Sequence, residues 1–219
     1  MKDKIKKEKK LNEELARYYG IILEALENVD NSYYNIPTTF NSEGIVRERV
    51  FCYEFYHQLR CLAKKDSNTN IKINGEIDKR GHELFDEDDQ KNPDFIFHLP
   101  GTMEKNLIIV EVKGKMSRGK NGCIKDFKTL KTFLEKYQYK IGIFILYNHD
   151  LMAFSTEFKE ELKEIFLEND ELEEISKRIF VICKNKQEES IEEKRLFDII
   201  CEEESIELCD VKIKKEKQQ

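Results

Sequence analysis

The chain has 219 residues, of which 39% are hydrophobic and 37% are charged, and its net charge is −6. This length suits one domain with appendages, and the composition excludes a disordered chain and is typical of a globular protein. The acidic balance excludes a general electrostatic attraction to nucleic acid, so a nucleic-acid surface would have to be a local patch. Neither a signal peptide nor an apolar run of membrane length is apparent, which favours a cytoplasmic protein without membrane contact.

The cysteines are expected to be buried thiols. They form no C-x-x-C pair, and their spacing is too irregular for a zinc site or a disulfide framework. The six are Cys52, Cys61, Cys123, Cys183, Cys201 and Cys209. His57 is likewise interpreted as structural.

Residues 1–41 are predicted to form an N-terminal helix and a loop. Residues 1–10 are dominated by lysine and should fray. Apolar residues then recur at helical spacing through about residue 28, namely Leu11, Leu15, Ile22 and Leu26. The segment 29–41 contains Asn, Ser, Thr and Pro, so it is expected to be a connection.

Residues 42–148 are predicted to form the core, in the order helix, three strands, helix, strand. The helix should begin after Ser42 as N-cap and end near Lys64. Alternating isoleucines predict a strand over 71–77, and a loop over 81–92 leads to the strands 94–99 and 107–113, which form a hairpin. A Lys/Arg/Gly loop over 114–122, a helix over 124–137 and a buried strand over 141–147 follow.

Residues 149–211 are predicted to be an extension of helices and strands on the same single domain, 1–219. An acidic helical stretch covers 156–177, a strand 179–183 and a helix 189–201, before a terminal strand and a flexible basic tail over 212–219. The order of helices and strands therefore predicts the fold class α/β (α+β).

Two acids and a lysine interrupt the otherwise apolar hairpin. Side chains two apart on a strand share a face, so Glu111 and Lys113 point the same way. With a connection over 100–105, Asp94 lies directly opposite Glu111, and their Cβ atoms are about 5 Å apart. Two carboxylates this close favour a bridging cation, and Mg²⁺ (or Mn²⁺) takes such oxygen ligands. The backbone carbonyl of Val112 is a further candidate ligand.

Pro93-Asp94 followed by Glu111-Val112-Lys113 on the next strand resembles the signature of the PD-(D/E)XK, or restriction-endonuclease-like, nuclease superfamily. The segments 92–98 and 106–113 are similar to a bacterial subgroup of uncharacterised or defence-associated members, and the resemblance covers about residues 43–148. It implies an αβββαβ core with a mixed central sheet flanked by helices, metal binding by Asp94 and Glu111, and a Lys113 that assists the attacking water. Many members also place a metal-binding Glu on the preceding helix. Here Glu48 is preferred, with Glu54, Glu76 and His98 as second-tier candidates.

The loop after the lysine strand is a candidate phosphate-binding segment, through Lys115, Arg118 and Lys120. Each functional interpretation has a structural alternative. Glu111 and Lys113 can form a cross-strand salt bridge on a half-exposed strand, and Asp94 can be a turn residue. His98 can be a packed side chain, and Glu48 an ordinary helix-start acid. The acidic helices over 156–177 would repel nucleic acid.

These expectations lead to a divalent-metal-dependent nuclease that hydrolyses DNA, in preference to RNA, most simply as an endonuclease. The alternative is a nuclease-fold subunit that binds without cutting, as part of a larger defence or DNA-processing system. Either protein could form a homodimer or act with partner proteins.

Overall fold

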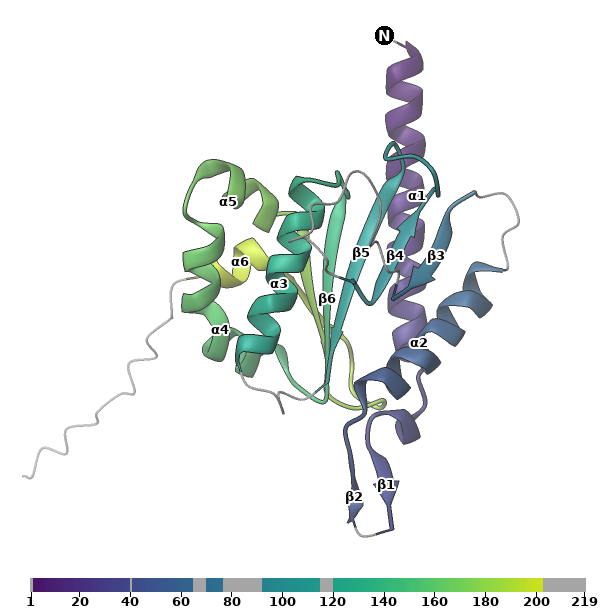
Figure 1. The fold of residues 1–219 in the computed structure, drawn as a ribbon, viewed down its shortest axis with the longest axis vertical. Coiled ribbons are helices and arrows are strands. Elements are labelled where there is room, and N and C mark those ends of the chain that lie inside the picture. Colours follow the sequence, from purple (N-terminus) through teal and green to yellow (C-terminus); the bar gives the residue numbers. More distant parts are fainter. Residues whose placement is uncertain (1, 40, 65–69, 77–91, 115–119, 203–219) are drawn as a thin grey trace, which may run out of the picture.

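The computed structural model describes residues 2–39, 41–64, 70–76, 92–114 and 120–202 (Figure 1). The chain is a mixed α/β protein whose six-stranded sheet has the order β3-β4-β5-β6-β7-β8. The strands β5, β6 and β7 are parallel neighbours, and the remaining neighbours are antiparallel. The bounds are β3 Lys72–Gly75, β4 Phe95–His98, β5 Asn106–Lys113, β6 Ile141–Tyr147, β7 Ile179–Lys184 and β8 Glu192–Arg195.

Helices cover both faces of this sheet, because its central strands are apolar on both sides. On one face, β5 residues such as Ile108 and Val110 pack against α1 Lys2–Glu27 and α2 Glu48–Ala63. On the other face, Ile109 of β5 and Ile96 of β4 join the core formed by α3 to α6. Those helices are α3 Lys120–Glu135, α4 Leu151–Phe166, α5 Asp170–Ser176 and α6 Leu196–Cys201. No helix among the described residues combines the length and apolar character needed to cross a membrane.

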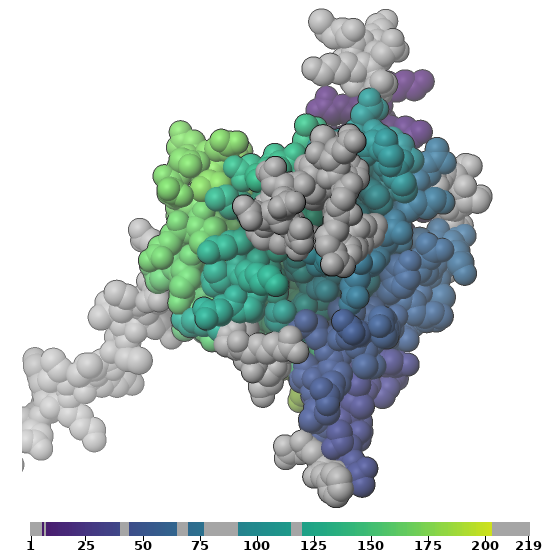
Figure 2. Space-filling view, viewed as in Figure 1, coloured from purple at the N-terminus to yellow at the C-terminus, as the bar shows by residue number. Residues whose placement is uncertain are grey.

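The N-terminal segment differs from the sequence prediction in two places. Helix α1 is continuous from Lys2, so the lysine-rich start does not fray before residue 10. Helix α2 begins at Glu48 and not after Ser42, because residues 36–45 form a separate hairpin of β1 Ile36–Thr38 and β2 Asn41–Ile45. A short 3-10 helix, η1 Asn31–Tyr33, precedes it. The hairpin extends beyond the sheet at the lower end of Figures 1 and 2.

The C-terminal half follows the predicted order with one correction. The acidic stretch is two helices, α4 and α5, and the strand at 179 is present as β7. The helix predicted over 189–201 is wrong in its first half, where β8 pairs antiparallel with β7 before α6 begins. Pairing with an open sheet edge supplies hydrogen bonds that the local sequence does not reveal. The predicted terminal strand and the tail 212–219 lie outside the described residues.

The hairpin register follows the prediction closely. Phe95 faces Val110 and Ile96 faces Ile109, the pairing expected from a connection over 100–105. The register shifts by one residue only at the loop end, where His98 pairs with Asn106. The undisturbed end of the hairpin is the end that carries Asp94 and Glu111.

Candidate active site

The two predicted acids meet at the end of the hairpin. Asp94 directly precedes β4, and its Oδ2 accepts a hydrogen bond from the backbone N–H of Val112 at 2.7 Å. Glu111 is buried within β5, with 5% of its surface exposed. Glu111 lies close enough to Asp94 for the charge of Asp94 to raise the pKa of Glu111. The expected juxtaposition is therefore present.

Burial favours the protonated form of both acids. It raises the pKa of Glu111 well above its ordinary range, and the neighbouring charge of Asp94 adds to the effect. The pKa of Asp94 rises to about 7, also mainly through burial, and the Val112 N–H opposes the rise. Two desolvated carboxyl groups without a cation are an unfavourable arrangement, and such shifted acids are typical of functional sites.

Lys113 lies on the same face of β5, and two further acids hold its ammonium group. Its Nζ is 2.9 Å from Oδ2 of Asp126 and 3.3 Å from Oε2 of Glu48. Burial alone would lower the pKa of Lys113, but the hydrogen bonds and charges of Asp126 and Glu48 outweigh it and raise the pKa. The lysine is therefore a fixed cation, and it bridges helices from opposite faces of the sheet.

Asp126 of α3 is a site residue that the sequence analysis missed. It is three residues after Cys123 and one before Phe127, both of which are buried on the inner face of α3. At helical spacing, these positions place Asp126 on the apolar face of the helix. Its position on that apolar face was the signal that could have identified it. Burial raises the pKa of Asp126, while Lys113 opposes the rise.

Glu48 lies at the start of α2 and contacts Lys113 rather than the acid pair. Its Oε1 also accepts from the lysine at 3.4 Å, and its Oε2 accepts the backbone N–H of Gly114 at 3.3 Å. Its contacts are consistent with a positioning role for Glu48, which would hold Lys113 and the chain that leaves β5.

The second-tier acids contact other partners, although Glu76 lines the same cavity as Asp94 and Lys113. Glu54 accepts a hydrogen bond from the Gln58 amide at 2.6 Å, one turn along its own helix. Glu76 pairs with Arg49 at 3.5 Å, where both side chains are largely exposed.

His98 contacts Asn74 at 3.1 Å. It lies four residues from Asp94 along an extended chain, which is about 13 Å.

The predicted phosphate-binding loop is only partly described. Lys120 begins α3, and its Nζ lies 2.6 Å from Oε1 of Glu161 on α4. Its side chain is therefore engaged with α4. Lys115 and Arg118 lie outside the described residues.

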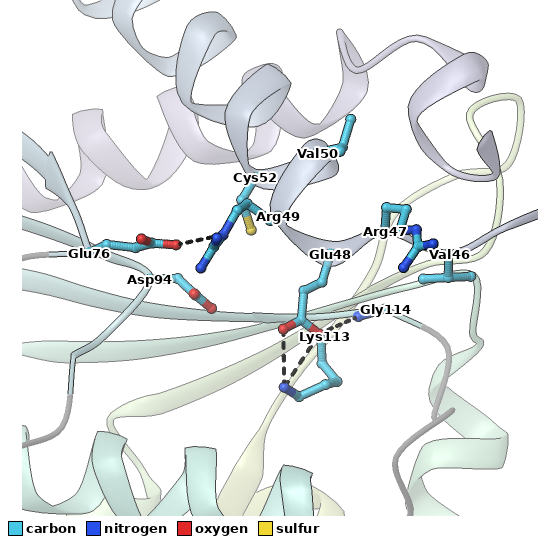
Figure 3. Close-up of a pocket in the computed structure, with 10 residues that line it drawn as sticks. All are labelled: Val46, Arg47, Glu48, Arg49, Val50, Cys52, Glu76, Asp94, Lys113 and Gly114. Carbon is cyan, nitrogen blue, oxygen red and sulfur yellow. Dashed lines mark hydrogen bonds and ion pairs between the residues drawn. The ribbon is translucent and has the colours of Figure 1, made fainter.

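A cavity of about 460 Å³ opens beside the acid pair. Asp94 and Lys113 lie on its wall, together with residues 46–50 of the α2 start (Figure 3). Arg47 and Arg49 are both exposed at this cavity, and neither was singled out from the sequence. The cavity wall thus combines three carboxyl groups, those of Glu48, Glu76 and Asp94, with one ammonium group and two guanidinium groups.

Among the described ranges, no three His, Cys, Asp or Glu side chains converge closely enough to hold a metal ion. Asp94 and Glu111 nevertheless supply two adjoining oxygen donors, and the Val112 carbonyl remains a third candidate. Mg²⁺ commonly takes one or two carboxylates and completes its shell with water and substrate oxygens, so this donor set fits such an ion. A bound cation would offset the unfavourable interaction between the two acids.

Searches of protein-family models, curated proteins and solved structures find no match for this chain. The functional interpretation therefore rests on the residues and their geometry.

Proposed function

We propose that this chain is a divalent-metal-dependent nuclease with a restriction-endonuclease-like core, which hydrolyses phosphodiester bonds in DNA. The observation that carries the proposal is the buried Glu111 beside the half-buried Asp94, with the Lys113 ammonium on the same face of β5. The order α2, β3, β4, β5, α3, β6 also corresponds to the αβββαβ order that the sequence resemblance implies.

Asp94, Glu111 and the Val112 carbonyl would hold the ion. When bound, a divalent ion polarises a phosphate and lowers the pKa of a water ligand. The chain positions the other charges around it. Because Asp126 and Glu48 fix the Lys113 ammonium, it is available to orient the attacking water or to stabilise charge that develops on the phosphate.

The arginines at the cavity are the residues best placed to bind phosphates of flanking nucleotides. Arg49 is paired with the exposed Glu76, and exposed ion pairs of this kind contribute roughly 0–1 kcal/mol. A phosphate can therefore replace Glu76 at little cost. Arg47 has an exposed side chain on the same wall. These two arginines supply the local positive charge that an acidic chain requires to bind nucleic acid.

The test is incubation with supercoiled, linear and single-stranded DNA and with RNA, with and without Mg²⁺ or Mn²⁺. We expect metal-dependent cleavage of DNA that is lost in Asp94→Asn, Glu111→Gln and Lys113→Met. Glu54→Gln is the matched control, because this acid lies on α2 but outside the cluster. Full activity in any of the first three variants would contradict the assignment.

One observation favours the second candidate, a nuclease-fold subunit that binds without cutting. Two of the four acids near the site are engaged with Lys113, and three metal-binding side chains do not converge within the described part of the chain. A calorimetric titration separates the two candidates. Binding of Mg²⁺ or Mn²⁺ that is lost in Asp94→Asn favours the enzyme, and no binding at millimolar metal favours the subunit.

A further inference from the structure

The outer face of α2 carries a thiol and an imidazole that already touch. Sγ of Cys61 and Nε2 of His57 are 3.6 Å apart, and both residues are exposed. They are four residues apart, which places them one above the other on the same side of the helix. The two donor atoms can therefore be reached from solvent without any change in the fold.

This separation matches the distance between two ligands of a tetrahedral zinc ion. Zn–S bonds are about 2.3 Å and Zn–N bonds about 2.0–2.1 Å, so ligands at a tetrahedral angle lie about 3.6 Å apart. Thiolate and imidazole are also the donors that Zn²⁺ prefers in proteins. Neither side chain has to change rotamer greatly to take an ion between them.

The pair is separate from the candidate active site in both place and chemistry. His57 and Cys61 follow Glu48 by nine and thirteen residues, which is about 14 and 20 Å along the helix axis. The acid pair offers hard oxygen donors, which suit Mg²⁺, whereas the α2 pair offers softer sulfur and nitrogen donors. The two sites should therefore select different ions.

We propose that His57 and Cys61 form a two-donor chelate for Zn²⁺ or a chemically similar transition-metal ion. On binding, the Cys61 thiol releases its proton to solvent, Sγ and Nε2 each form a bond to the ion, and four of the six water ligands of the aqueous ion leave it. The other two positions of the ion keep water or take an external donor. A structural zinc site normally has four protein ligands, so this site exchanges its ion readily.

Titration with Co²⁺ tests the proposal, because a thiolate ligand gives an intense sulfur-to-cobalt absorption band that carboxylates do not give. The full chain is used with the Asp94→Asn substitution, which weakens metal binding at the acid pair. We expect a band that saturates at one ion per chain, proton release during the titration, and loss of the band when Zn²⁺ is added.

The variants identify the ligands. Cys61→Ser should abolish the band, and His57→Asn should weaken Co²⁺ binding by more than about tenfold, since even outer-shell partners of metal ligands contribute about that much. Cys201→Ser is the matched control, because Cys201 is also an exposed thiol, and it should leave the band unchanged. Far-UV circular dichroism confirms that the exposed substitutions keep the fold. A band that persists in Cys61→Ser overturns the proposal. The absence of a band at millimolar Co²⁺ also overturns it, and the 3.6 Å contact is then only a thiol–imidazole hydrogen bond.

Discussion

Replacing Asp94 with asparagine should stabilise the cation-free protein, and more strongly at alkaline than at acidic pH. Burial raises the pKa of Asp94 from 3.8 to about 7, so the folded state keeps a proton that the unfolded state has lost. A raised folded-state pKa contributes stability that is present below about pH 4 and lost as the pH rises through about 7. Asparagine has no such proton to lose.

The structure sets the size of this effect. The change in the pKa of Asp94 from 3.8 to about 7 corresponds to at most about 4 kcal/mol in the free energy of unfolding. About two thirds of this stabilisation is lost above about pH 5. Asp94 lines a cavity and accepts the Val112 N–H, so water and this hydrogen bond stabilise its charged form and reduce the loss. We expect the advantage of Asp94→Asn over the wild type to grow by about 1–2 kcal/mol between about pH 5 and about pH 8.

Urea denaturation in the presence of a chelator, at both pH values, measures this difference. Glu54→Gln is the control, since it replaces an acid outside the cluster. Mg²⁺ added at about pH 8 should stabilise the wild type but not Asp94→Asn. An advantage of Asp94→Asn that is the same at both pH values, or that shrinks as the pH rises, would refute the reasoning.

Three further substitutions test the packing and charges around the site by the same denaturation measurement. Gly114→Ala places a Cβ 2.7 Å from the Tyr147 hydroxyl, so it should lower the free energy of unfolding by about 1–3 kcal/mol, and an unchanged value would argue against this close approach. In Gly20→Ala, the added Cβ meets open space within α1, so the substitution should raise the free energy of unfolding by roughly 0.5–1 kcal/mol. A decrease would argue against an undistorted helix there. Lys113→Met leaves Asp126 without its cation and should cost about 2–3 kcal/mol at neutral pH. Because burial raises the pKa of Asp126, that cost should shrink as acid protonates it, and a cost independent of pH would contradict the ion pair.

Sequence patterns were sufficient to predict the hairpin of β4 and β5. Alternation along β5 and the length of the connection after β4 were enough to predict that Asp94 and Glu111 would meet, because strand register follows from local geometry. The bounds of β6 and β7 were also predicted closely, since their apolar runs are continuous. Helix α2 was predicted, but its start was placed five residues early. The local sequence did not reveal the hairpin of β1 and β2.

Contacts between distant segments account for most of what was missed. Asp126 enters the site from α3 and Arg49 pairs with Glu76, and neither partnership has a sequence spacing that predicts it. Glu76 and His98 looked suitable because they lie on the strands beside Asp94. Their side chains instead contact Arg49 and Asn74.

The sequence by itself determined the strand and helix order of the core and the acid pair of the hairpin, because both depend on side-chain period and short connections. Only the tertiary structure decided which charges surround that pair. Lys113 lies between Glu48 and Asp126 because α2 and α3 pack on opposite faces of the same sheet and both reach the end of β5. Packing of distant apolar surfaces fixes that meeting point, and no local pattern encodes it.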